Sequence, residues 1–198
     1  MREETLKEYP SVPEEAALAE ALEAPRLAVH RLADDGTYPN NPRLPLLVYR
    51  DAFRFPEAGD PAALIEQVFS ANGWPAAWRN GVFAFHHYHS TAHEVLGVYG
   101  GRARLLFGGP DGVEVETERG DVVVLPAGVA HKRLQASPDF AVVGAYPEGQ
   151  DYDMNYGEAG ERARADRRIR DLPIPAVDPV YGPHGPLTET WRTRAQID

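Results

Sequence analysis

The clearest helical pattern in the chain lies between residues 60 and 73. Apolar residues recur there three and four positions apart, and they are Leu64, Ile65, Val68 and Phe69. Asp60 is a suitable N-cap, Pro61 fits the first turn, and Asn72-Gly73 is a common way to end a helix. The pattern predicts a surface helix that packs its apolar face on a sheet.

From residue 80 to residue 147 the pattern changes to short runs of β-branched and aromatic residues. Turn-forming sequences separate these runs, namely Gly-Gly, Pro-Asp-Gly, Arg-Gly-Asp and Pro-Ala-Gly. Runs of this length, broken by tight turns, are typical of antiparallel strands. We therefore expect an all-β core over 80–147.

The flanking segments predict an arm on each side of this core. Ser11 and Glu14 have capping-box spacing for a short helix, and the apolar run 44–49 follows prolines that favour an edge strand or an extended arm. The charged stretch 158–171 favours a solvated helix, and the proline-rich stretch 172–191 favours an extended tail lying on the domain or on a partner subunit. We expect one structural domain, with an N-terminal arm over 1–79 and a C-terminal part over 148–198.

Composition and charge exclude several classes of partner. Thirty acidic residues against twenty basic residues give a formal charge of -10, which repels nucleic acids and anionic lipid surfaces. The chain has no cysteine, so a metal site would have to use His, Asp or Glu. The first residues are too acidic for a signal peptide, and no apolar run approaches the length of a membrane span. We expect a cytoplasmic protein without nucleic-acid or membrane partners.

Four of the seven histidines lie in one stretch, which reads HHYHSTAHEVLG over residues 86–97. If the preceding VFAFHHYH is a strand, Phe83, Phe85, His87 and His89 share one face, since side chains alternate along a strand. A hairpin loop of two or four residues places Glu94 on that same face. A loop of three residues places His93 there instead, so the pattern leaves open whether Glu94 or His93 completes a ligand set.

A second stretch, GDVVVLPAGVAHKRL over residues 120–134, predicts a buried strand, a turn and then another histidine. Pro126 and Gly128 stiffen the turn and direct His131 back across the sheet. Arg133 would share the face of His131 and could bind a substrate carboxylate.

The spacing of these residues resembles the two cupin motifs. Gly81, His87, His89, Glu94 and Gly101 match the first motif, and Gly120, Pro126, Gly128 and His131 match the second. The resemblance implies a cupin double-stranded β-helix, a jelly-roll barrel, with His87, His89, Glu94 and His131 as metal ligands. Gln135 stands where the second motif usually has asparagine, which leaves the ligands unchanged.

Further segments are similar to the YjlB-like branch of single-domain cupins, among them NGWPAAWRNGVFAFHHYH, YPEGQDYD and DPVYGP. The resemblance supports the fold and the metal site, and the ligand set would hold one divalent transition metal, either Fe, Mn, Ni, Co, Cu or Zn. Because such an ion keeps open positions, our leading hypothesis is a metal-dependent enzyme acting on a small, oxygen-rich molecule. Dioxygenase-like oxidation is our first hypothesis. A metal-dependent isomerase or lyase, with Tyr88 or His93 moving the proton, is the second, and a non-catalytic ligand binder or sensor is the third. We also expect a homodimer.

Overall fold

The structure is a computed structural model that describes residues 18, 20–24 and 26–195. The helix expected from the capping box at Ser11 and Glu14 begins outside the described residues.

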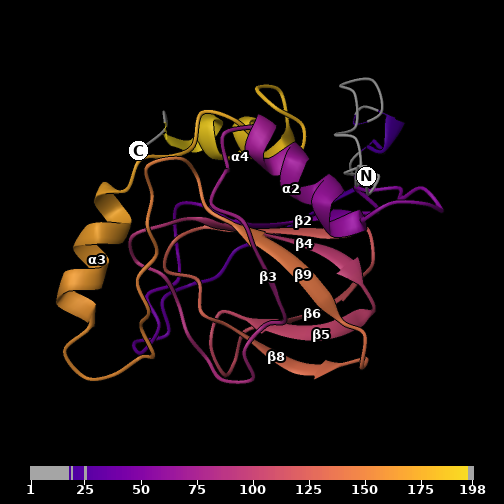
Figure 1. Cartoon of the computed structure of the whole chain (residues 1–198). Helices are drawn as coiled ribbons and strands as arrows, with labels where there is room; N and C mark the ends of the chain where they lie inside the picture. Colours follow the sequence, from indigo (N-terminus) through magenta and orange to yellow (C-terminus); the bar gives the residue numbers. More distant parts are fainter. Residues whose placement is uncertain (1–17, 19, 25, 196–198) are drawn as a thin grey trace, which may run out of the picture.

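Two antiparallel sheets form the body of the molecule. The larger sheet consists, in spatial order, of β1 (Arg26–His30), β2 (Leu46–Arg50), β7 (Val122–Leu125), β4 (Glu94–Gly100), β9 (Ala141–Ala145) and β3 (Trp78–Asn80). The smaller sheet consists of β6 (Val113–Glu118), β5 (Arg102–Phe107) and β8 (His131–Ala136). Figure 1 shows the two sheets stacked face to face. This arrangement confirms the all-β prediction.

The helices α2 (Pro61–Ala71), α3 (Arg162–Asp171) and α4 (Pro186–Ala195) lie around the sheets. Figure 1 shows α2 and α4 over the outer face of the larger sheet, with α3 standing beside the sheets. The predicted helix is confirmed in α2, because the Asp60 side chain accepts a hydrogen bond from the Ala62 N–H and Asn72 is the C-cap. A Cβ at Gly97 of β4 would lie 2.9 Å from Ile65, so glycine allows α2 to approach the sheet closely.

The apolar core has two layers, one on each face of the larger sheet. Leu46 and Val48 of β2 face the smaller sheet, whereas Leu47 and Tyr49 pack under the helices. The strands β2 and β7 are therefore buried on both faces, and every residue of β7 is buried. This explains why their sequences are continuously apolar rather than alternating.

The expectation of an edge strand at 44–49 is wrong. β2 lies inside the sheet and pairs with β1 on one side and β7 on the other. Pro42 and Pro45 precede the strand, so they remove none of its ladder hydrogen bonds. The edge position belongs to β1, which the sequence pattern did not predict.

The expectation of an extended C-terminal tail is also wrong in part. Pro186 occupies the first turn of α4, a position that proline tolerates because its missing N–H would have no helical partner there. Leu187 and Trp191 are fully buried, and the Trp191 indole N–H donates to the Pro45 carbonyl at 3.0 Å. The tail thus packs on its own domain. The solvated helix expected over 158–171 is present as α3, in which only Ala165 is buried.

None of the helices in the described part of the chain is long and apolar enough to cross a membrane.

Candidate metal centre

Three buried histidines converge between the two sheets. His87, His89 and His131 are each at most 5 % exposed, and one ring nitrogen of each lies within 4.8 Å of the others. Such a group could hold a metal ion, since imidazole nitrogens are among the commonest metal ligands in proteins.

The sequence pattern suggested that His87 and His89 lie on a regular strand, but they do not. The segment from Gly81 to His93 forms only isolated bridges, one of which pairs His87 with His131 through N–H···O bonds of 3.2 and 2.9 Å. The His89 carbonyl accepts from the Gly128 N–H at 2.7 Å. The segment therefore lies against the start of β8 rather than folding onto β4 as a hairpin.

The turn before His131 is fixed by contacts that only its sequence permits. Gly128 has φ +95°, and a Cβ there would lie 2.2 Å from the Asn40 carbonyl oxygen. The Ala130 N–H donates to the Asn40 side chain at 3.1 Å. A buried asparagine thus holds the backbone next to His131, which agrees with the stiff turn expected from Pro126 and Gly128.

Hydrogen bonds on the far side of each ring fix which nitrogen is free. The Nδ1 atoms of His87, His89 and His131 lie 3.2, 2.5 and 3.1 Å from the carbonyl oxygens of Phe85, Asp153 and Val129, respectively. A carbonyl only accepts, so each Nδ1 carries a proton, and the neutral form of each ring has its lone pair on Nε2. This is the tautomer that a histidine ligand needs when it binds a metal through Nε2.

Glu94 is the first residue of β4 and its side chain reaches the same point. Its Oε2 lies 3.4 Å from His131 Nε2 and 3.6 Å from His89 Nε2. The Tyr146 hydroxyl donates to Oε1 at 3.0 Å, whereas Oε2 is buried and has no hydrogen-bond partner. A buried carboxylate oxygen without a partner is costly, so a cation near Oε2 would fit the site.

The cluster also perturbs the pKa values of its own members. Burial alone would raise the pKa of Glu94, but the neighbouring imidazoles, His89 first, lower it to about 2. Burial, assisted by His87, lowers the pKa of His131 to about 3, and burial also lowers the pKa of His87. Burial opposes the charge on His89 as well, yet the Glu94 carboxylate raises its pKa. The group therefore favours an ionised Glu94 and neutral His87 and His131.

His93, the alternative to Glu94, points away from this cluster. Its ring is 1 % exposed, accepts a hydrogen bond from the Ala127 N–H at 3.0 Å and lies 5.0 Å from the Trp191 ring. Burial lowers its pKa to about 3. The geometry thus corresponds to the alternative in which Glu94, and not His93, joins the histidines.

Tyr88 and Arg133, the other candidates for a catalytic role, also lie outside the cluster. The Tyr88 ring is fully buried, and its hydroxyl donates to Glu161 Oε2 at 3.3 Å. Arg133 donates through Nε to the Val82 carbonyl at 3.1 Å. These contacts hold both side chains to neighbouring loops. Arg133 nevertheless shares the inner face of β8 with His131, as expected, because its pairing partner Leu105 in β5 belongs to the core.

A cavity of about 430 Å³ opens onto the histidines and Glu94. Its remaining walls include Trp78, Arg79, Val82, Phe83, Phe85, Leu96, Tyr146, Tyr152, Met154 and Tyr156. The side chains at 146–156 were missed from the sequence as part of the site. The signal that could have found them is the run of tyrosines at 146, 152 and 156, in a segment without strand alternation.

Comparison with known proteins places this arrangement in a family. The family model described as Cupin matches residues 78–148. The uncharacterized protein YjlB of Bacillus subtilis (strain 168) is 44% identical over 158 residues, which cover 80% of this chain and 92% of that protein. The chain belongs to the YjlB-like family of cupins. This assignment and the two antiparallel sheets confirm the predicted cupin fold.

Two solved structures are similar to this YjlB-like chain at lower sequence identity. Acireductone dioxygenase from Bacillus anthracis, solved with a cadmium ion in its active centre, is 22% identical, with 46% of this chain and 62% of that chain covered and a TM-score of 0.37. The epimerase RmlC from Legionella pneumophila is 13% identical, with 62% and 72% covered and a TM-score of 0.36.

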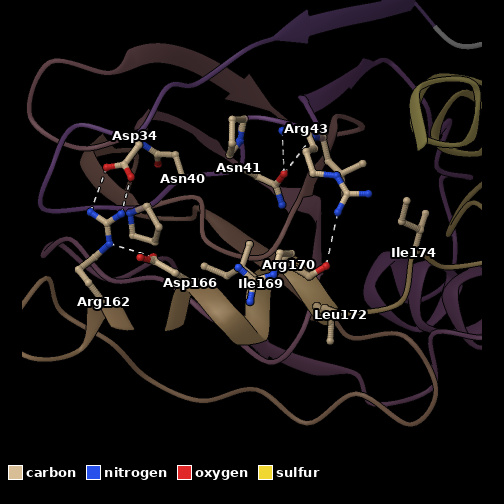
Figure 2. Close-up of a pocket in the computed structure, with 13 residues that line it drawn as sticks. Asp34, Asn40, Asn41, Arg43, Arg162, Asp166, Ile169, Arg170, Leu172 and Ile174 are labelled. Atoms are coloured by element: carbon tan, nitrogen blue, oxygen red, sulfur yellow. Dashed lines mark hydrogen bonds and ion pairs between the residues drawn. The ribbon is translucent and has the colours of Figure 1, made fainter. Parts of the chain in front are cut away.

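A second pocket of this cupin, of about 300 Å³, lies between α3 and the segment 34–44. Figure 2 shows Asp34 and Asp166 facing Arg162, and Arg43 reaching the backbone of Arg170. Arg162 donates to Asp34 and, at 3.0 Å, to Asp166, while Arg43 donates to the Arg170 carbonyl at 3.4 Å. These contacts join α3 to the loop that precedes β2.

Proposed function

We propose that this YjlB-like cupin is a metal-dependent enzyme that acts on a small organic molecule. The observation that carries the proposal is the Oε2 atom of Glu94, which is buried without a hydrogen-bond partner beside the Nε2 atoms of His89 and His131. A carboxylate left in this state would be costly, whereas a divalent cation would satisfy it.

The donor set fits a divalent transition metal. The residues that would hold it are His87, His89 and His131 through Nε2, and Glu94 through Oε2. Iron, manganese, cobalt, nickel, copper and zinc all accept imidazole and carboxylate ligands. Such an ion would act as a Lewis acid, and it would be redox-active if it were iron, manganese, cobalt or copper.

Oxidation by molecular oxygen is the reaction that we propose first. In a dioxygenase-type reaction both atoms of O₂ enter the product, so no external reductant is required. The competing isomerase or lyase hypothesis needs a second side chain to move a proton. Tyr88 and His93, which were considered for that task, lie away from the cavity and bind other groups.

Metal analysis tests the first part of the proposal. Protein purified without chelators and without a nickel column should contain about one equivalent of a transition metal. The variant Glu94→Gln should retain much less of it, because the buried negative charge is lost. Metal-free wild-type protein that also fails to bind added Fe²⁺, Co²⁺ or Zn²⁺ would overturn the proposal.

Oxygen consumption tests the reaction type. Anaerobically iron-loaded protein should consume oxygen with at least one compound among catechols, thiols, diketones and hydroxy acids. Glu94→Gln, treated in the same way, measures the oxygen uptake caused by iron that is free in solution. Retention of metal without oxygen uptake across the panel would count against an oxygenase and favour a ligand binder.

We also propose that the chain forms a homodimer. Support comes from the edge strand β1, where Leu27 and Val29 are 41% and 44% exposed. Apolar side chains on an exposed sheet edge favour pairing with another chain. Sedimentation at several concentrations tests this proposal.

A further inference from the structure

Aromatic side chains surround the opening of the cavity above the histidines. Phe83, Phe85, Tyr152 and Tyr156 line it and are 49%, 47%, 52% and 45% exposed, respectively. Four large aromatic side chains gathered around one opening leave an apolar surface in contact with water. Surfaces of this kind on a folded protein commonly mark a ligand site.

Ring contacts connect this opening to the histidines. Phe83 and Phe85 stack with their centroids 4.8 Å apart, and they lie 5.2 and 5.7 Å from the His87 ring. Tyr152 lies 5.1 Å from the His89 ring. Aromatic surface therefore extends from solvent down to two of the proposed metal ligands.

The cavity walls offer no free positive charge for an anionic group. Arg79 lines the cavity, but it donates to both oxygens of Glu66 and to Asp60 at 2.6–2.8 Å. The other charged group in the wall is Glu94, which lies beside the histidines. Among the residues that the structure describes in this cavity, none would pair with a remote carboxylate or phosphate.

We infer that the substrate is a planar aromatic compound that carries two neighbouring oxygen atoms on one side. This inference rests on the proposed function, because the two oxygens would bind the metal ion. Four protein ligands leave two positions on a six-coordinate ion, and a chelating pair of oxygens fills both. The ring would then lie among the aromatic side chains of the opening, in offset-stacked or edge-to-face contact.

Two hydroxamates that differ only in their organic group test this inference by binding. Acetohydroxamate and benzohydroxamate chelate metals through the same two oxygens, but only the second carries a ring. We would load the protein with Co²⁺ and follow the visible absorption of the metal during titration. Benzohydroxamate should bind roughly tenfold more tightly or better, because its phenyl ring becomes buried.

Variants of the opening show whether the difference arises there. The double variant Phe83→Ala, Phe85→Ala should reduce the preference for benzohydroxamate about tenfold and leave acetohydroxamate binding unchanged. Both side chains are half exposed, so the variant should fold. Glu114→Ala, an exposed position on β6 that does not line the cavity, is the control and should behave as the wild type.

The outcomes separate the two proposals. Failure to bind Co²⁺ would overturn the proposed metal centre itself. Co²⁺ binding with equal affinity for both hydroxamates, or with affinity for neither, would leave the metal centre in place and overturn the aromatic substrate. A preference for benzohydroxamate that persists in the double variant would also overturn it.

Discussion

The cavity above the histidines and the pocket beside α3 are both lined by polar side chains, but they differ in how those groups are satisfied. In the pocket, each charged group faces an opposite charge or a backbone group, as Arg162 does with Asp34 and Asp166. In the cavity, Glu94 Oε2 is buried without a partner. Polar groups that satisfy one another hold a structure together. A buried acceptor that is left over, next to three imidazoles, supports the proposal that a cation binds there.

The two regions are nevertheless connected through one side chain. Asn40 lines the pocket and is 1% exposed. Its Nδ2 donates to the carbonyls of Ala33 and Gly108 at 2.8 and 3.0 Å, and its Oδ1 accepts from Ala130, the residue before His131. The pocket beside α3 thus supports the backbone that carries His131, one of the proposed ligands.

Removal of metal should have the largest effect on stability, because it leaves the buried Glu94 carboxylate in the cavity without a partner. A ligand present at about a thousand times its Kd stabilises the folded state by about 4 kcal/mol. For a chain of this length that corresponds to a rise in Tm of roughly 8–16 °C. A chelator should therefore lower the Tm of the metal-loaded protein by about this amount, measured by calorimetry.

Glu94→Gln is the matched control, since its Tm should not respond to the chelator. An equal response of wild type and variant would show that the metal binds elsewhere. An unchanged wild-type Tm in the presence of saturating metal would show that this cluster does not bind the ion in the folded state.

Asn40→Gly should destabilise the metal-free protein by about 3 kcal/mol, since three hydrogen bonds worth about 1 kcal/mol each are lost. Glycine is the suitable replacement because Asn40 has φ +49°, where alanine would add backbone strain. Urea unfolding of the chelated protein measures the effect. Arg43→Ala, in the same pocket but exposed, should cost less than about 1 kcal/mol. Equal losses in both variants would contradict the role assigned to Asn40.

The sequence predicted the parts of this site that depend on local geometry. Strand β7, the turn at Pro126 and Gly128, and His131 follow one another as strand–turn–histidine in the chain, and the structure has them so. The α2 helix was predicted with its caps for the same reason. Local sequence determines these features, because each depends on contacts within a few residues.

The sequence did not predict features that depend on distant segments. His87 and His89 share a face without a strand, because the start of β8 and the segment near Asp153 supply their backbone partners. Tyr146 reaches Glu94 from a position 52 residues away in the chain. No spacing rule covers such contacts. The sequence likewise did not show which groups bind the side chains of Tyr88, His93 and Arg133, since these partners lie in other segments.

Tyr146→Phe sharpens the comparison within the cavity. The Tyr146 hydroxyl donates to Glu94 Oε1, so its removal should let the carboxylate move and weaken metal binding roughly tenfold. Loss of a side chain that hydrogen-bonds a metal ligand typically lowers metal affinity by about 10–100-fold. Competition with a chromophoric chelator measures the affinity. Tyr152→Phe is the matched control, because Tyr152 stacks on Tyr146 at 4.8 Å and should leave metal affinity unchanged. A loss of affinity in both variants would assign the effect to packing.

The smallest effect should come from the ion pairs of the second pocket. Arg162 donates to Asp34, to Asp166 and to the Gly36 carbonyl. The side chains of Arg162, Asp34 and Asp166 are, however, 26%, 45% and 43% exposed. Water and salt screen pairs of this kind, which contribute less than about 1 kcal/mol each. A double-mutant cycle of Arg162→Ala and Asp34→Ala, followed by urea unfolding, should give a coupling free energy in that range that shrinks as salt is added. Metal affinity should be the same in all four proteins. A coupling well above 2 kcal/mol, or a loss of metal in Arg162→Ala, would mean that this pocket also carries function and that polar satisfaction does not distinguish the two regions.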